Sequence, residues 1–155
     1  ILALFFRSLL MAVLALVPAS LTLLVTFGIM GASEIPMDVG TSMISGIALG
    51  VGIDYAVHFF WRYRQPRADE VSARLRETLG ATGWGIVINA LEVSLGLSLL
   101  VFGTVMPMRN FGLLTASAML VSCLFTLLLL PALGRLAAHL RSGAAKAPTP
   151  NREAT

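Results

Sequence analysis

Residues 46–64 read Gly46-Ile47-Ala48-Leu49-Gly50-Val51-Gly52-Ile53-Asp54-Tyr55-Ala56-Val57-His58-Phe59-Phe60-Trp61-Arg62-Tyr63-Arg64. This stretch places an acid, Asp54, inside an apolar run that contains three glycines. An ionised carboxylate costs roughly 2.5 to 3.5 kcal/mol at the centre of a membrane helix, so an intramembrane acid indicates a functional site by default. The aromatic and basic residues that follow are typical of a helix that leaves the membrane at the cytoplasmic interface. We therefore interpret the stretch as a membrane span that carries a functional acid.

The composition extends this interpretation to the whole chain. Of its 155 residues, 57% are hydrophobic and 12% are charged, and the mean hydropathy is positive. This is too apolar for an ordinary soluble domain. The formal net charge is only +3, and the basic residues fall mostly on one side of the expected membrane, so we expect no nucleic-acid partner. Cys123 is the single cysteine, and we expect it to pack as a small hydrophobic side chain.

The apolar runs predict an all-α, polytopic transmembrane helix bundle over residues 1–136. A span needs about 20 residues, and four runs are long enough, whereas residues 1–6 are expected to be the end of a fifth helix. The expected spans are residues 9–30, 42–61, 83–105 and 111–136.

Two further segments are expected outside the membrane. Val71, Leu75 and Leu79 recur every four residues, which predicts a cytoplasmic amphipathic helix over about residues 69–79 that lies along the membrane surface. Residues 137–155 contain few large apolar side chains, so we expect them to form a disordered cytoplasmic tail.

The basic residues predict the orientation. Arg7, the cluster from Arg62 to Arg76, and the residues from Arg135 onward fall on one side, whereas only Arg109 falls on the other. By the positive-inside rule, the first side is cytoplasmic. We therefore expect a multi-pass protein of the cell inner (plasma) membrane with a cytoplasmic C-terminus. We also expect no signal peptide and expect the chain to be a piece of a larger protein.

The glycines of residues 46–64 favour close helix contact. Gly46 and Gly50 are four residues apart, and Gly52 extends the smooth surface towards Asp54. Such small-xxx-small spacing lets two helix backbones approach closely, and a packing face is the more common use of it. An acid in a close-packed helix must receive partners from neighbouring helices.

Glu92 is one candidate partner of Asp54. At ~1.5 Å per residue, Glu92 on the antiparallel third span lies at a similar depth to Asp54. Two neighbouring acids of this kind would share or exchange a proton. The alternative is a protonated Glu92 that bonds to a residue such as Asn89 or Ser94 and only holds helices together.

Tyr55 and His58 are the other candidates for a proton relay with Asp54. Tyr55 points roughly 100° away from Asp54 on a helix, and its hydroxyl can reach a facing helix. The alternative for Tyr55 is an interfacial aromatic. His58 lies one turn beyond Asp54 on the same face, and imidazole changes its protonation readily near neutral pH. The alternative for His58 is a satisfied polar residue near the interface.

These residues together resemble a known family. The pattern Gly46-xxx-Gly50-x-Gly52-x-Asp54-Tyr55-Ala56-x-His58-Phe59-xx-Arg62-Tyr63-Arg64 is similar to the fourth helix of a half-repeat in the resistance-nodulation-division (RND) superfamily. Its MmpL-type and hopanoid-exporter-like branch, which is related to sterol-sensing domains, is the most similar. The resemblance covers about residues 1–136 and includes four further segments: Ile35-Pro36-Met37-Asp38, Gly83, Asn110-Phe111-Gly112 and Leu130-Pro131-Ala132-Leu133.

The resemblance implies an exporter of hydrophobic or amphiphilic molecules, such as lipids, hopanoid-like compounds or drugs, that is driven by the proton motive force. In that family an Asp-Tyr pair in the fourth helix serves in proton relay, and Asp54 and Tyr55 match this pair. The chain would be the C-terminal repeat, and its partners would be membrane lipids, the exported molecule, the missing N-terminal repeat and periplasmic domains, and further copies in a homo-oligomer. Glu92 replaces a small or hydroxyl residue of the family, so the resemblance leaves its role open.

An intramembrane protease and a lipid-binding module are two other classes of function to compare with the sequence. Gly50-Val51-Gly52-Ile53-Asp54 is similar to the Gly-x-Gly-Asp signature of intramembrane aspartyl proteases, but it has an extra residue, and no second intramembrane Asp completes a dyad. The sequence also contains no nucleophile elbow, zinc-ligand spacing or phosphate-binding loop. We therefore expect no enzyme, no metal and no cofactor, with protons as the coupling ion. A sterol-sensing-like lipid-binding module without transport is the alternative to an exporter.

Overall fold

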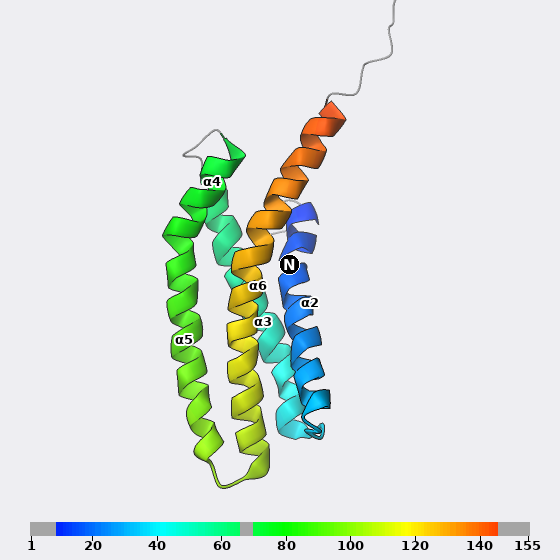
Figure 1. The fold of residues 1–155 in the computed structure, drawn as a ribbon, viewed down its shortest axis with the longest axis vertical. Coiled ribbons are helices and arrows are strands. Elements are labelled where there is room, and N and C mark those ends of the chain that lie inside the picture. Colours follow the sequence, from blue (N-terminus) through cyan, green and yellow to red (C-terminus); the bar gives the residue numbers. More distant parts are fainter. Residues whose placement is uncertain (1–8, 66–69, 146–155) are drawn as a thin grey trace, which may run out of the picture.

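The computed structural model describes residues 9–65 and 70–145, and these residues form a bundle of long antiparallel helices (Figure 1). Four helical segments are long and apolar enough to cross a membrane: Ala12–Ala32, Val39–Tyr63, Val71–Phe102 and Met106–Leu136. The described part of the chain contains no strand. The prediction of an all-α transmembrane bundle is confirmed, while the expected fifth helix at residues 1–6 lies outside the described residues.

Helix α2 (Leu9–Ala32) and helix α3 (Val39–Tyr63) are joined by a short connection. Asp38 begins α3, because its Oδ1 accepts a hydrogen bond from the Thr41 backbone N–H at 2.7 Å and the Thr41 hydroxyl accepts one from the Asp38 N–H at 2.7 Å. This reciprocal capping box satisfies two donors that a helix start otherwise leaves open. It fixes the end of α3 that is opposite to Arg62 and Arg64.

The third membrane-crossing segment is a continuous rod of four elements. Helix α4 (Val71–Thr78) passes through the π-helical turn η1 (Leu79–Gly83) into α5 (Trp84–Ser98), which ends in the 3-10 turn η2 (Leu99–Phe102). The amphipathic stretch is therefore helical, but it continues α5 (Figure 1), whereas we expected a separate helix along the membrane surface. Leu75 is buried and its Cδ2 would lie 3.4 Å from a Cβ built on Gly134 of α6, so α4 is held against the bundle.

Helix α6 (Met106–Ala145) extends beyond the expected end of the last span at residue 136. The residues that follow are mainly alanine, leucine and arginine, which are strong helix formers, and no proline interrupts them before residue 148. Residues 137–145 are therefore helical, whereas we expected a disordered tail from residue 137 onward. The rest of that expected tail, residues 146–155, lies outside the described residues.

The core of the bundle is built around α6, which packs against α2, α3 and α5. Helices α3 and α5 both contact α6 but do not pack closely against each other along their lengths; α3 instead contacts α4 and η1. Small residues such as Ala15 and Ala56 lie at the centre of the helix contacts, and Cys123 is buried against Tyr55. The prediction that Cys123 packs as a small apolar side chain is confirmed.

Large apolar side chains cover much of the outer surface of the described bundle. Many of them are well exposed: Leu24, Trp84, Leu95, Leu99 and Phe102. A surface of this kind suits the hydrocarbon of a membrane, in which a helix satisfies all of its own backbone hydrogen bonds.

Candidate functional site

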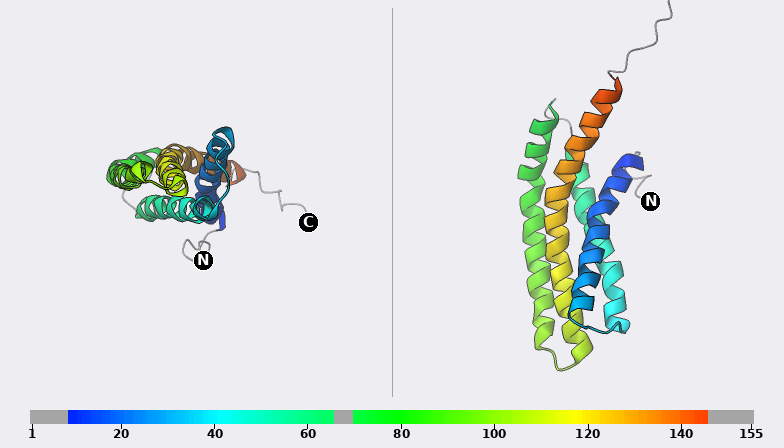
Figure 2. Two further views of the ribbon diagram at one scale, coloured as in Figure 1. Left: turned by 90° about the horizontal axis from the view of Figure 1, so that it is seen from below. Right: turned by 45° about the vertical axis from the view of Figure 1, so that its right-hand side comes forward.

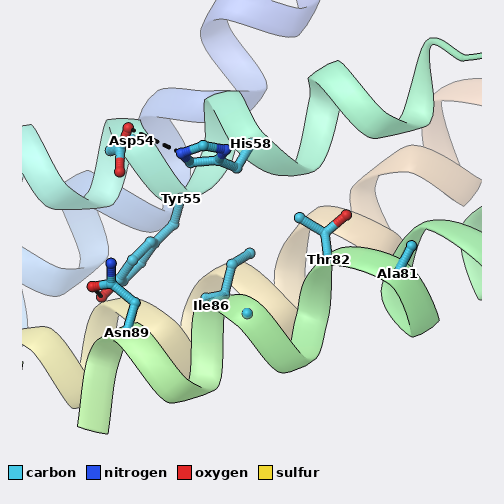
Figure 3. Close-up of a pocket in the computed structure, with 8 residues that line it drawn as sticks. Asp54, Tyr55, His58, Ala81, Thr82, Ile86 and Asn89 are labelled. Atoms are coloured by element: carbon cyan, nitrogen blue, oxygen red, sulfur yellow. Dashed lines mark hydrogen bonds and ion pairs between the residues drawn. The ribbon is translucent and has the colours of Figure 1, made fainter. Parts of the chain in front are cut away.

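A pocket of about 300 Å³ opens between α3 and the segment formed by η1 and the first turns of α5. The pocket exists because α3 and α5 both pack against α6 but do not pack closely against each other. Figure 3 shows side chains from the two walls approaching the same space. The lining residues are Asp54, Tyr55, His58, Ala81, Thr82, Gly85, Ile86 and Asn89.

Asp54 and His58 lie on one wall of the pocket, one helical turn apart. The distance from His58 Nε2 to Asp54 Oδ1 is 3.6 Å (Figure 3), which forms an ion pair when the imidazole is protonated. The two side chains are 63% exposed for His58 and 59% exposed for Asp54. The described part of the chain therefore surrounds Asp54 on one side only, whereas we expected a buried acid. The reason is that the described helices pack against the opposite face of α3.

Tyr55 follows Asp54 in sequence but points into the bundle. Its side chain is 2% exposed and packs against Ile86, Ala90 and Cys123. Its hydroxyl lies 3.5 Å from Asn89 Oδ1 on α5 and donates a long hydrogen bond to it. The expectation that the Tyr55 hydroxyl reaches a facing helix agrees with this geometry. Because α3 and α5 do not pack closely, Tyr55 and Asn89 bridge the space between them.

Glu92 does not line the pocket that contains Asp54. It lies on α5, three residues beyond Asn89, and its side chain is exposed on the described bundle. Within the described residues it makes no hydrogen bond to Asn89 or Ser94; the Ser94 hydroxyl donates instead to the Ala116 carbonyl at 3.0 Å. The structure thus brings Glu92 together with none of its expected partners, Asp54, Asn89 or Ser94. The part of Glu92 in a relay stays a prediction.

The three glycines of α3 have different surroundings. A Cβ built on Gly52 would lie 3.0 Å from Ala19 Cβ on α2, so α2 and α3 approach each other closely there. A Cβ built on Gly46 or Gly50 meets no atom within 4 Å. Gly46 and Gly50 share a stripe with Asp54 and His58, because all four are spaced by four residues. No described helix packs closely against Gly46 or Gly50. Their role in helix packing stays a prediction, and the partner helix would belong to another chain or to another segment of the protein.

Sequence analysis missed the contribution of the α5 wall. Asn89 was considered only as a partner of Glu92, and Thr82 and Gly85 were not considered at all. The signal available was their spacing, since residues 82, 85 and 89 share one face of a helix. That face becomes meaningful only when the antiparallel pairing of α5 with α3 is known, because single-helix periodicity does not identify the neighbour. In the described residues no cluster of three His, Cys, Asp or Glu side chains has the geometry of a metal site.

The fold and the pocket together define a class of protein: a multi-pass membrane protein in which an acid of one span lines a pocket between that span and the next. The sequence profile of the MMPL family matches residues 1–155. The chain belongs to the MMPL family.

Two curated relatives are similar to the chain. A membrane protein of Methanocaldococcus jannaschii is 30% identical over 135 residues, an alignment that covers 86% of this chain and 35% of the relative. A membrane protein of Streptomyces coelicolor is 32% identical over 138 residues, covering 72% of this chain and 19% of the relative. The chain thus spans about a third of one relative and about a fifth of the other. No solved structure matches the chain.

Proposed function

We propose that the chain is part of the membrane domain of an RND-type exporter that uses the proton motive force to move hydrophobic or amphiphilic molecules, such as lipids or drugs. In this proposal Asp54 carries the coupling proton and Tyr55 assists it. The chain belongs to the hopanoid-exporter-like branch and forms the C-terminal repeat of a protein in the inner membrane, with its C-terminus in the cytoplasm. The missing N-terminal repeat, the periplasmic domains and further copies of the protein complete the transporter.

The observation that carries the proposal is the position of Asp54. A carboxyl group within a membrane span is costly, so an acid kept there indicates a functional site. Here it lies 3.6 Å from an imidazole in a pocket that also contains a tyrosine and an asparagine. Membership in the MMPL family supports a transport role. Asp54 is also exposed on the described bundle, so it can meet the counterpart repeat against which alternating access requires movement.

Replacement of Asp54 by asparagine tests this function. The Asp54→Asn substitution keeps the shape of the side chain and removes its ability to carry a proton. We expect the full-length protein, reconstituted in vesicles with an imposed pH gradient, to lose export of a fluorescent phospholipid and of a lipophilic dye. Expression level and gel-filtration profile should match those of the wild type.

Two acids of the same chain provide controls for this experiment. Glu34→Gln changes an exposed acid in the connection between α2 and α3 and is expected to transport normally. Glu92→Gln tests whether the second intramembrane acid shares the role. Unchanged, pH-dependent transport by the Asp54→Asn protein would show that Asp54 is structural. If the Glu92→Gln protein then lost transport, the proton carrier would be Glu92 instead.

A further inference from the structure

The pocket extends from Asp54 towards one end of the bundle, which we term the basic end. The basic end is where α3 finishes with Arg62 and Arg64 and where α4 begins the next rod. Asp54 and Asn89 lie at the inner limit of the pocket, and Ala81 in η1 lies nearest the basic end. His58 lies between these limits (Figure 3), one turn from Asp54 towards the C-terminal end of α3.

The wall opposite His58 is made of small residues and a π-helical turn. Ala81 and Gly85 contribute no bulky side chain, and a Cβ built on Gly85 meets no atom within 4 Å. The π-helical turn Leu79–Gly83 is wider than an α-helical one, and such turns are frequent at functional sites. The wall therefore keeps space open beside His58.

The chemistry of the lining favours water as the occupant. A buried water needs two to four polar partners and occupies about 30 Å³ in the liquid. The pocket offers the Asp54 carboxyl, the His58 imidazole, the Thr82 hydroxyl and the Asn89 amide in a volume of about 300 Å³. This volume holds on the order of ten waters. Non-helical or widened backbone within a membrane is also tolerated where it lines a water-filled cavity.

We propose that this pocket is a water-filled path from Asp54 to the basic end, and that His58 passes protons along it. The inference rests on the proposed function for the role of Asp54, but the water path itself does not. In one direction the Asp54 carboxyl gives its proton to His58 Nε2, and the imidazolium then releases a proton to pocket water; the reverse order takes up a proton.

The charged groups around His58 are compatible with this step. On α3 itself it faces Asp54, and Arg62 lies one turn further on, where its Nη1 donates to Gln65 Oε1 at 2.6 Å. The residues that face it from η1 and α5 carry no ionisable side chain. Arg74 and Glu77 of α4 line a separate cleft with Arg62. Tyr55, the other titratable group that lines the pocket, directs its hydroxyl at Asn89. Among the described residues, Asp54 is thus the acid paired with His58.

Cysteine accessibility tests the water path without any transport assay. In the full-length protein with Cys123→Ala, the Gly85→Cys variant places a thiol in the pocket wall. We expect a membrane-impermeant cationic methanethiosulfonate to label it from the basic end and not from the opposite side. Leu91→Cys on the same helix is the matched control, because Leu91 is 47% exposed but lies outside the pocket. Labelling of Gly85→Cys no faster than that of Leu91→Cys would overturn the path.

Filling the pocket and removing the imidazole test the role of His58. Gly85→Leu and Gly96→Leu both place a side chain where the described bundle leaves space, but only Gly85→Leu fills the pocket. We expect His58→Gln and Gly85→Leu to slow proton-driven dye export on the order of 100-fold, the low end for a positioned proton-transfer group, and Gly96→Leu to leave it unchanged. Wild-type export rates in His58→Gln would exclude His58 from the path.

The outcomes separate this inference from the proposed function. If Gly85→Cys is labelled and Asp54→Asn still exports, the water path stands and the role of Asp54 fails. If Asp54→Asn loses export and Gly85→Cys is not labelled, Asp54 keeps its role and the water path fails.

Discussion

At the scale of single residues, neighbours in sequence have opposite surroundings. Asp54 is exposed in the pocket beside His58, whereas Tyr55 is buried and reaches Asn89 on α5. This division follows from the rotation of about 100° per residue along an α-helix. One residue is therefore free to meet a proton donor or a moving partner, while the next links two helices that do not otherwise pack closely.

Removal of the Tyr55 hydroxyl should affect transport more than stability. Tyr55→Phe keeps the ring that packs against Ile86 and Cys123 and loses one hydrogen bond, which in a membrane protein costs about 0.6 kcal/mol. We expect a nearly unchanged melting temperature in detergent and slower proton-driven dye export. Tyr63→Phe is the control, since it keeps the ring beneath the Arg74 guanidinium and lies outside the pocket. Equal export by both variants would show that the Tyr55 hydroxyl plays no part.

At the scale of elements, the hairpin formed by α5, η2 and α6 depends on one glycine. A Cβ built on Gly112 would lie 2.6 Å from Leu100 Cβ and 2.7 Å from the Leu97 carbonyl oxygen. The backbones of η2 and α6 approach so closely that no side chain fits between them. Only residues 103–105 connect η2 to α6. This connection is too short to let the two helices move apart.

A methyl group at this position should therefore destabilise the protein. We expect Gly112→Ala to lower the free energy of unfolding by about 1 to 3 kcal/mol, the usual cost of overpacking. The measurement is the temperature at which the protein loses gel-filtration monodispersity in detergent, which we expect to fall. Gly96→Ala, where a Cβ meets no atom within 4 Å, is expected to be neutral or slightly stabilising because alanine favours helix. Equal melting of the two variants would contradict the close contact at Gly112.

At the scale of the whole molecule, the helix order brings the basic residues together. Figures 1 and 2 show the alternating directions of α2, α3, the rod from α4 to η2, and α6. From the bounds of these helices, Arg62, Arg64 and Arg135 lie towards one end, and Glu34 and Arg109 lie at the other. From the positive-inside rule we expect the basic end to face the cytoplasm.

Thiol labelling of intact cells tests this orientation. With Cys123→Ala as background, Met37→Cys introduces a thiol in the exposed connection before α3, and Gln65→Cys introduces one just beyond α3 at the basic end. We expect a membrane-impermeant maleimide to label Met37→Cys in intact cells and Gln65→Cys only after permeabilisation. The reverse labelling pattern would show that the basic end faces the outside of the cell.

The sequence by itself determined that the described part of the chain has four membrane spans, their alternating directions and the placement of Asp54 within one of them, but not that the amphipathic stretch continues into the third span. These features depend on apolar run length and local residue order, which the chain carries directly. The i,i+4 relation of Asp54 and His58 was predictable for the same reason. The end of the last helix was missed because the alanine-rich residues after position 136 lack bulk for a core but favour helix.

Only the tertiary structure decided which residues share the pocket. The contact of Tyr55 with Asn89, the exclusion of Glu92, and the different surroundings of Gly52 and Gly46 all depend on how α3 and α5 lean on α6. That arrangement results from many small side chains packing together across helices. Periodicity along one helix identifies its faces, but the neighbour that each face meets is set by the whole bundle.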